Sequence, residues 1–468
     1  MEAFEADSMT EQQTENLGET AERASFPPGL HNAYFFSTFN AFSFQIVLSS
    51  PMVLYAKTLG ASATVLGIIA GMMPLLVIFQ IPAANYIPRH GFKRFVYAGW
   101  GTRVMFIFAM ALVPLTGFFL KGETRLVLML SLLFGFNLSR GISSCAWLPW
   151  ITALVPTALR GKYLARDAAV QNLASFITFL IAAACLAGTP GAWQFTVLFA
   201  FSAVMGAVSL TFLKRIPDAE MPEETRDSKG PVPWLEMLRF PPFWKLLRAL
   251  IGYSVAYGGM TAFTVAFLKT ETGMSEGKIL LVNSVAFLGG LSSLWFLGSR
   301  LDRLGSKPVL TFCFSAWVAV LAGWMALSGG VFPARLSIVP LLQFLMGLLA
   351  ALIQMANTRL AMAIIPVMGR NHFFAIYSTL GNVTLGLAPI GWGLLIDAVG
   401  HHSSTWLGIE WNRYTVFFAA AALCFTVTLA LARRLHEPEA ASMEDLLREI
   451  LIQSPQRFWI RFWPRGGT

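Results

Sequence analysis

One arginine of this chain lies deep within an apolar segment. Arg140 is near the middle of residues 125–154, which carry little other charge. A cation in hydrocarbon costs a few kcal/mol or more, so such an arginine is a functional candidate. Its guanidinium suits a carboxylate, phosphate or sulfate group on a ligand. The alternative is a structural arginine bonded to backbone carbonyls, to Asn40 or to Gln45, and the sequence leaves both interpretations open.

Other polar and aromatic side chains within apolar segments form a second candidate group. Amides and tyrosines offer directional hydrogen bonds and indoles offer flat apolar faces, a mixture that suits a polar organic solute. Taken singly, each is more often a helix–helix contact than a ligand contact, so the prediction depends on the group. Its members are Asn40, Gln45, Trp147, Tyr253, Tyr257, Gln354 and Asn357.

Residue patterns typical of enzymes are missing from the sequence. Cys145, Cys185, Cys313 and Cys424 lie in apolar runs without a CxxC pair, as expected of buried thiols. The sequence has no nucleophile–base pair, no metal-ligand spacing and no phosphate-binding loop. We therefore expect no enzyme activity, no ATP-driven pumping, no catalytic residue, no metal and no cofactor.

Composition places these residues in a membrane. Of 468 residues, 56% are hydrophobic and only 13% are charged, whereas a soluble domain has about 25% charged residues. The net charge of +9 arises from basic residues scattered between apolar spans. This distribution predicts membrane orientation and argues against nucleic-acid binding.

Twelve apolar segments are long enough to cross a bilayer, which takes about 20 residues. They are residues 31–56, 62–87, 95–119, 125–154, 166–188, 192–214, 244–268, 276–300, 308–328, 336–365, 371–398 and 413–435. The predicted parts are an acidic cytoplasmic tail (1–30), two six-span halves (31–214 and 244–435), a linker (215–243) and an amphipathic, basic-aromatic tail (436–468). Lys and Arg are more numerous in the loops that share a side with both termini, so we expect both termini in the cytoplasm.

The two halves repeat each other. Pro156, Arg160, Tyr163 and Asn172 recur as Pro366, Arg370, Phe373 and Asn382, at one constant spacing. A constant spacing over distant segments indicates duplicated architecture. We therefore expect an all-α polytopic membrane protein, with twelve transmembrane helices in two pseudo-symmetric six-helix bundles. Asn172 and Asn382 are expected at the bundle interface.

The loop after the eighth span carries a motif. Its sequence, Gly298-Ser-Arg-Leu-Asp302-Arg303-Leu-Gly305-Ser-Lys307-Pro308, resembles the signature loop of the major facilitator superfamily of secondary transporters. The resemblance covers residues 31–435. It implies alternating access about a central cavity lined by the first, fourth, seventh and tenth spans.

The same resemblance implies a gate on the cytoplasmic side. The loop aspartate, Asp302, is expected to close against the start of the fifth span, because a carboxylate is stabilised at a helix N-terminus. The matching first-half loop has Pro88 in place of the aspartate, so we expect an asymmetric gate. Its predicted residues are Gly298, Asp302, Arg303, Gly305, Lys307, Arg160, Arg166 and Arg89.

A glycine-proline stretch in span 11 has two interpretations. Gly386, Pro389, Gly391 and Gly393 indicate close helix packing, and a hinge is the second interpretation.

The predicted function is transport of a small organic solute, with an anion among the compatible substrates. A non-transporting assembly factor or sensor of the same fold is the alternative, and a cavity filled by aromatic rings would favour it. The spans are nearly free of acids, so facilitated diffusion, anion exchange about Arg140 and an unusual coupling route all remain open. The expected partners are the lipid bilayer, a small-molecule solute and, where transport is coupled, an ion. We expect a monomer in a bacterial-type inner membrane.

Overall fold

The computed structural model describes residues 26–156, 159–219, 234–297, 305–332, 338–365, 370–406 and 408–435. The first half is helical throughout. Its elements are α2 (His31–Leu48), α3 (Ser50–Thr58), α4 (Ala63–Leu76), η1 (Val77–Phe79), α5 (Gln80–Ala84), α6 (Ile87–His90), α7 (Phe92–Leu112), η2 (Val113–Phe118), α8 (Gly122–Ser143), η3 (Ser144–Ala146), α9 (Trp147–Leu154), α10 (Arg160–Cys185) and α11 (Ala192–Arg215).

The second half adds one small hairpin to its helices. Its elements are α12 (Trp234–Arg239), α13 (Pro241–Tyr257), α14 (Met260–Thr270), α15 (Glu276–Leu297), α17 (Ser306–Ser328), α18 (Ile338–Ile364), α19 (Arg370–Val399), β1 (Ser404–Trp406), β2 (Ile409–Trp411) and α20 (Arg413–Arg433). Within the described residues, eleven helical spans are long and apolar enough to cross a membrane. Helix α15 occupies the predicted eighth span, so the twelve-span architecture is confirmed.

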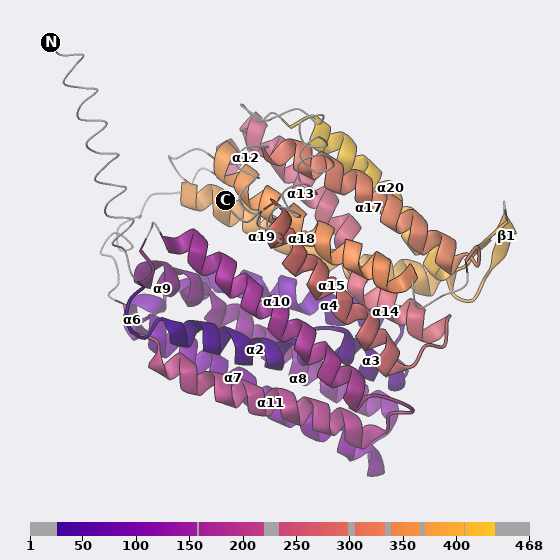
Figure 1. The fold of residues 1–468 in the computed structure, drawn as a ribbon, viewed down its shortest axis with the longest axis horizontal. Helices are drawn as coiled ribbons and strands as arrows, with labels where there is room; N and C mark the ends of the chain where they lie inside the picture. Colours follow the sequence, from indigo (N-terminus) through magenta and orange to yellow (C-terminus); the bar gives the residue numbers. More distant parts are fainter. Residues whose placement is uncertain are drawn as a thin grey trace, which may run out of the picture.

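The helices form two bundles that lie side by side (Figure 1). In the first, α11 packs against α2 and α7, and α8 packs against α7; in the second, α17 packs against α18 and α20. Two helix pairs make most of the contact between the bundles, α4 with α19 and α10 with α15, and α3 adds contacts with α14 and α15. We call this contact the seam.

The two ends of the molecule differ in what they carry. One end, the terminal face, holds residues 26–30, 216–219 and 434–435 together with α6 and α9 (Figure 1). The other end, the distal face, holds residues 59–62 and the β1–β2 hairpin.

The first spans of both halves are broken, which the sequence prediction missed. The predicted span 31–56 divides at Ser49 into α2 and α3, because Pro51 cannot donate a backbone hydrogen bond to the preceding turn. The predicted span 244–268 divides at Gly258 and Gly259, where Gly259 adopts a φ of 80°. The breaks lie at corresponding places, as expected of repeated halves.

Spans 2 and 4 are also interrupted, and they cross at their interruptions. A Cβ atom on Gly141 would lie 2.1 Å from the carbonyl oxygen of Leu76, so only glycine allows this approach. Gln80 Nε2 donates to Ser144 Oγ at 2.7 Å beside the crossing. The short 3₁₀ turns η1 and η3 begin here, which fixes the backbone next to Arg140.

Several predicted segments fall on residues outside the described ranges. These include residues 1–25 of the acidic tail, residues 220–233 of the linker and the whole tail from 436. Within the predicted linker, Trp234–Arg239 forms the short helix α12, and the next helix begins at Pro241. The loop residues Gly298, Asp302 and Arg303 also lie outside the described part of the chain.

Candidate functional site

Arg140 lies in the last turn of α8, half-buried, directly before the crossing of spans 2 and 4. Helix C-terminal carbonyls carry partial negative charge, which stabilises a cation at this position. The proposed amide partners of Arg140 bind other groups. Asn40 Oδ1 accepts from Trp100 Nε1 at 3.3 Å, and Gln45 Nε2 donates to Ser175 Oγ at 2.8 Å. The structural interpretation of Arg140 thus loses the two side-chain partners suggested for it.

A second interior arginine was missed by the sequence reasoning. Arg103, in α7, is 4% exposed, and its guanidinium carbon lies 4.5 Å from the ring centre of Trp100 and 5.0 Å from that of Phe136. Its Nε and Nη1 atoms are buried without a hydrogen-bond acceptor. Phe136 lies one turn before Arg140 on α8, so the Arg103 guanidinium packs against the same helix that carries Arg140.

The signal for Arg103 was present in the sequence. Arg103 interrupts the apolar segment 95–119 just as Arg140 interrupts 125–154, so the same rule identifies both. Asn137, one turn before Arg140, adds a buried carbonyl oxygen, Oδ1, that has no donor. The first bundle therefore holds two cations and several unsatisfied polar atoms in its interior.

Trp147 belongs to an aromatic cluster on the terminal side of this bundle. Its ring centre lies 4.9 Å from that of Phe36, 6.2 Å from that of Trp100 and 6.0 Å from that of Trp150. Trp100 faces both this cluster and the Arg103 guanidinium. The cluster therefore forms a rigid apolar wall beside the interior cations.

The candidates of the second half lie in a different environment. Tyr253 and Tyr257 stack at 5.3 Å, and Trp317 stacks on Phe425 at 5.0 Å with the planes 5° apart. Tyr257 also meets Trp317 edge-on at 5.8 Å. These rings fill the interior of the second bundle, so Tyr253 and Tyr257 are packing residues first.

The two candidates on α18 differ in exposure. Gln354 is exposed and Asn357 is 9% exposed. The predicted group is therefore dispersed among several environments. Its role in binding stays a prediction.

The seam is closed tightly on the distal side by small residues. A Cβ atom on Gly67 would lie 2.2 Å from the Pro389 carbonyl oxygen, and one on Gly71 would lie 2.2 Å from that of Gly386. A Cβ atom on Gly393 would lie 2.5 Å from the Ala63 carbonyl oxygen. The close-packing interpretation is confirmed for Gly386 and Gly393, because the backbones of α4 and α19 touch here, whereas Gly391 faces open space.

Asp397 completes this closure. Its Oδ1 accepts from the backbone N–H of Ala63 at 3.0 Å, and its Oδ2 accepts from the N–H and the hydroxyl of Thr64 at 2.8 and 2.6 Å. A carboxylate of the second bundle thus caps the N-terminus of α4 in the first, where the helix dipole favours negative charge. The sequence predicted this kind of contact for Asp302 at the other face.

The broken first spans add a buried amide link near the distal side. Asn283 Nδ2 donates to Ser50 Oγ at 3.0 Å across the seam, and Gln343 Nε2 donates to Asn283 Oδ1 at 2.9 Å. Ser50 stands at the break that begins α3, which contacts α14, the matching half-helix of the other bundle. The distal halves of spans 1 and 7 therefore take part in the closure.

On the terminal side the same pair of spans leaves a cavity. A space of about 240 Å³ lies between span 2 and α19, lined by Gln80, Cys145 and Asn382 among others. Asn172 approaches Gly290 across the other helix pair of the seam. Both repeated asparagines thus lie at the bundle interface, as predicted.

The predicted gate residues that the structure describes have other contacts. Arg160 donates to the carbonyl oxygens of Thr152 at 2.9 Å and Val155 at 3.3 Å, so it caps the end of α9. The Arg166 guanidinium carbon lies 6.0 Å from the ring centre of Phe26. Arg89 is exposed at the end of α6, and Gly305 and Lys307 stand at the start of α17. Since Asp302 lies outside the described residues, its contact with the start of span 5 stays a prediction.

Two six-helix bundles with broken first spans and a seam closed at one face define a polytopic secondary transporter. The sequence profile of the Major Facilitator Superfamily matches residues 32–334 and 260–463. The chain belongs to this superfamily and is an integral multi-pass membrane protein, for which membership supports membrane transport of small solutes.

Solved structures share the fold at low sequence identity. A D-xylose–proton symporter superposes with a TM-score of 0.67 at 12% identity, covering 87% of this chain and 98% of the symporter. A single-residue mutant of the nucleoside transporter NupG superposes with a TM-score of 0.65 at 12% identity, covering 86% of this chain and 99% of the transporter. A bacterial homolog of the human lysosomal transporter Spinster, inward-facing and unoccupied, superposes with a TM-score of 0.62 at 13% identity. The superposition covers 90% of this chain and 100% of the homolog. No curated protein sequence matches the chain significantly.

Proposed function

We propose that this protein carries a small organic anion across the membrane by alternating access, and that Arg140 holds the anion. The observation that carries the proposal is the pair of interior arginines in the first bundle. Arg103 is buried with two nitrogen atoms unsatisfied, and its guanidinium packs on Phe136, one turn before Arg140 on α8. Two like charges in one interior require a negative partner, and a ligand anion would supply it.

The charge balance of the first half supports this proposal. Its acidic residues in the ranges 26–156 and 159–219 are Glu123, Asp167 and Asp218. Glu123 is in the first turn of α8 at the distal face, and Asp218 follows α11 at the terminal face. Asp167 lies near the start of α10 and accepts a hydrogen bond from Gln171. Within these ranges no carboxylate pairs with Arg103 or Arg140.

The orientation and conformational state are part of the proposal. The excess of Lys and Arg in the loops of the terminal face supports a cytoplasmic location for that face. With this orientation the structure is inward-facing, because the Asp397 cap and the glycine contacts close the opposite side. Substrate release or capture would then occur from the cytoplasm.

A second function remains in competition because of one observation. The interior of the second bundle is filled by Tyr253, Tyr257, Trp317 and Phe425 in mutual ring contact. A non-transporting assembly factor or sensor would need no open path through this bundle. The same rings also suit a transporter in which the second bundle moves as one rigid body.

The test compares each anionic solute with a neutral partner of related structure. Purified protein would be heated with matched pairs of probes: benzoate and benzamide, glutarate and glutaramide, and uridine 5′-monophosphate and uridine. Anionic members are expected to raise the unfolding midpoint, and their neutral partners are expected to leave it unchanged. A ligand present at a concentration of about 100 times its Kd raises the free energy of unfolding by about 2.7 kcal/mol, which such an assay detects easily.

Substitutions test which residue binds the anion in this assay. Arg140→Gln should abolish the response to anions, and Arg140→Lys should keep part of it because it keeps the charge. Arg248→Gln is the control, since Arg248 lies over Trp244 in the second bundle and away from the interior pair. Equal responses to charged and neutral probes, or an unchanged response in Arg140→Gln, would contradict the proposal.

A further inference from the structure

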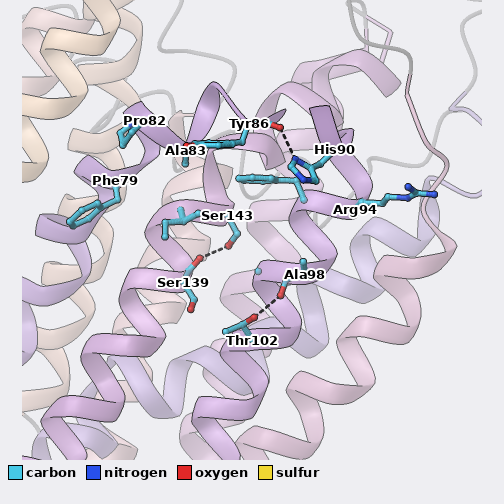
Figure 2. Close-up of a pocket in the computed structure, with 13 residues that line it drawn as sticks. Phe79, Pro82, Ala83, Tyr86, His90, Arg94, Ala98, Thr102, Ser139 and Ser143 are labelled. Atoms are coloured by element: carbon cyan, nitrogen blue, oxygen red, sulfur yellow. Dashed lines mark hydrogen bonds between the residues drawn. The ribbon is translucent and has the colours of Figure 1, made fainter. Parts of the chain in front are cut away.

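A groove on the flank of the first bundle is not used by the proposed transport path. It has a volume of about 710 Å³ and lies between the broken end of span 2 and helices α7 and α8 (Figure 2). The groove and the seam use different faces of span 2: Phe79, Pro82 and Ala83 line the groove, whereas Gln80 and Ile81 line the cavity at the seam. The groove therefore opens on the side away from the second bundle.

The deeper part of the groove is apolar. The hydroxyl groups of Thr102 and Ser143 both donate to carbonyl oxygens of their own helices, at 3.0 Å to Ala98 and 2.7 Å to Ser139 (Figure 2). With these hydroxyls satisfied, the surface offered to a ligand is mostly hydrocarbon, and Ser139 adds one further hydroxyl. Phe79 at 41% and Ile142 at 38% exposure show that this surface is open to the surroundings, which for a membrane-spanning flank are lipid.

The end of the groove at the terminal face is polar and carries basic residues. His90 and Arg94 are among its lining residues, and the His90 ring nitrogen Nδ1 lies 3.0 Å from the Tyr86 carbonyl oxygen (Figure 2). The Arg94 guanidinium extends outward from His90 and Tyr86, so it lies at the outer rim of the groove (Figure 2). Arg89 and Lys93 belong to the same turn, and residues 80–122 contain no acidic residue. An anionic group would therefore meet positive charge from several side chains of a segment that itself carries no carboxylate.

The dimensions suit one acyl chain below a headgroup. Arg94 stands near the start of α7 at the membrane face, and Thr102 is eight residues further along the same helix. At 1.5 Å per residue this is a depth of about 12 Å. This geometry holds whichever side of the membrane the terminal face occupies.

We propose that this groove binds an anionic phospholipid, with the phosphate at Arg94 and His90 and one acyl chain along Phe79, Ala98 and Ile142. Phosphatidylglycerol fits this site better than phosphatidylcholine, because the headgroup of phosphatidylcholine carries its own cation toward the basic rim. The inference does not depend on the substrate proposed above, since Arg140 is not among the residues that line the groove.

Native mass spectrometry of the delipidated full chain in detergent tests the inference. The protein would be titrated with phosphatidylglycerol or phosphatidylcholine of identical acyl chains. The wild type is expected to bind its first phosphatidylglycerol molecule with a lower Kd than its first phosphatidylcholine molecule. Arg94→Gln should weaken that first phosphatidylglycerol by about fivefold and leave phosphatidylcholine unchanged, since one basic residue near the surface contributes about 1 kcal/mol.

A second variant fills the groove without changing its charge. Ala98→Trp should weaken the first phosphatidylglycerol strongly, and Arg248→Gln, the control, should behave as the wild type. If Ala98→Trp fails to fold, Arg94→Gln alone decides the outcome. Equal binding of the two lipids by the wild type, or unchanged phosphatidylglycerol binding in Arg94→Gln, would overturn the inference. Displacement of the lipid by inorganic phosphate would overturn the acyl-chain contact.

Discussion

The two bundles share one fold but have opposite interiors. The first holds Arg103 and Arg140 among tryptophans, with polar atoms that lack partners. The second is filled by stacked rings, and two of its buried amides, Asn283 and Gln343, bond to each other. Duplication therefore preserved the backbone, including the breaks in spans 1 and 7, while the interior side chains diverged.

This difference assigns separate tasks to the bundles. An uncompensated charge in a low-dielectric interior is costly and gains most from a ligand of opposite sign. A close-packed aromatic interior resists deformation, because side chains at crystal-like density transmit strain. We infer that the first bundle binds and that the second moves against it as a rigid body.

The largest expected effect is that of Arg140→Gln on anion affinity. Truncating one partner of a buried charge pair costs about 2–5 kcal/mol, so the Kd of an anion found by thermal shift should rise by at least about thirtyfold. Isothermal titration calorimetry would measure it, with Arg248→Gln as the control. A Kd equal to that of the control would remove the distinction between the bundles.

Arg103→Met should change stability and affinity in opposite directions. Methionine fills a similar space without charge, and such replacements of buried ions are neutral or stabilising by about 1–4 kcal/mol. We expect a higher unfolding midpoint without ligand and weaker anion binding, measured on the same preparation. A clear loss of stability would instead identify Arg103 as a satisfied structural cation.

A smaller effect is expected for Asp397, the carboxylate of the second bundle that binds the N-terminus of α4 in the first bundle. Asp397→Asn keeps an acceptor at the N-terminus of α4 but removes the charge, which is worth about 0.3–1 kcal/mol there. The distal face should open more often. Spin labels at Lys121 and His402, in a background without the four cysteines, should show a broader and longer distance distribution by double electron–electron resonance.

The matched control for this measurement is Glu410→Gln, since Glu410 is an exposed carboxylate in β2 at the same face. Its distance distribution should equal that of the unsubstituted protein. If Asp397→Asn and Glu410→Gln gave the same distribution, the helix cap would have no part in closing the distal face.

The smallest effect is expected for Tyr257→Phe. The ring and its stacking on Tyr253 remain, and only the hydroxyl is lost. A hydrogen bond contributes about 0.5–1.5 kcal/mol where one exists, so an unchanged Kd by calorimetry would agree with a purely packing role. A tenfold weaker anion affinity would show that the second bundle also binds the solute.

Sequence reasoning identified the spans, the repeat and Arg140, because each depends on hydropathy or spacing along the chain. It treated spans 1 and 7 as single helices, although Pro51 and Gly258–Gly259 mark the breaks. Arg103 met the criterion used for Arg140 and was passed over.

Contacts across the seam could not be predicted. Asp397 binds Ala63 and Thr64, which are more than 300 residues away in the chain and come together only when the bundles dock. The glycines of span 11 indicated close packing, but the matching glycines of span 2 become evident only in the packed structure. Charged residues within the spans can thus be identified from the sequence, whereas the groups that they contact depend on how the two bundles pack.

The most direct test of the central claim is anion exchange in proteoliposomes. Vesicles loaded with an unlabelled anion from the thermal-shift set would be placed in the same anion carrying a radiolabel. We expect label to enter vesicles that contain the wild type or Arg248→Gln, and we expect Arg140→Gln to reduce entry to the level of protein-free vesicles. Binding of the anion by the wild type without any entry of label would contradict transport and favour the sensor.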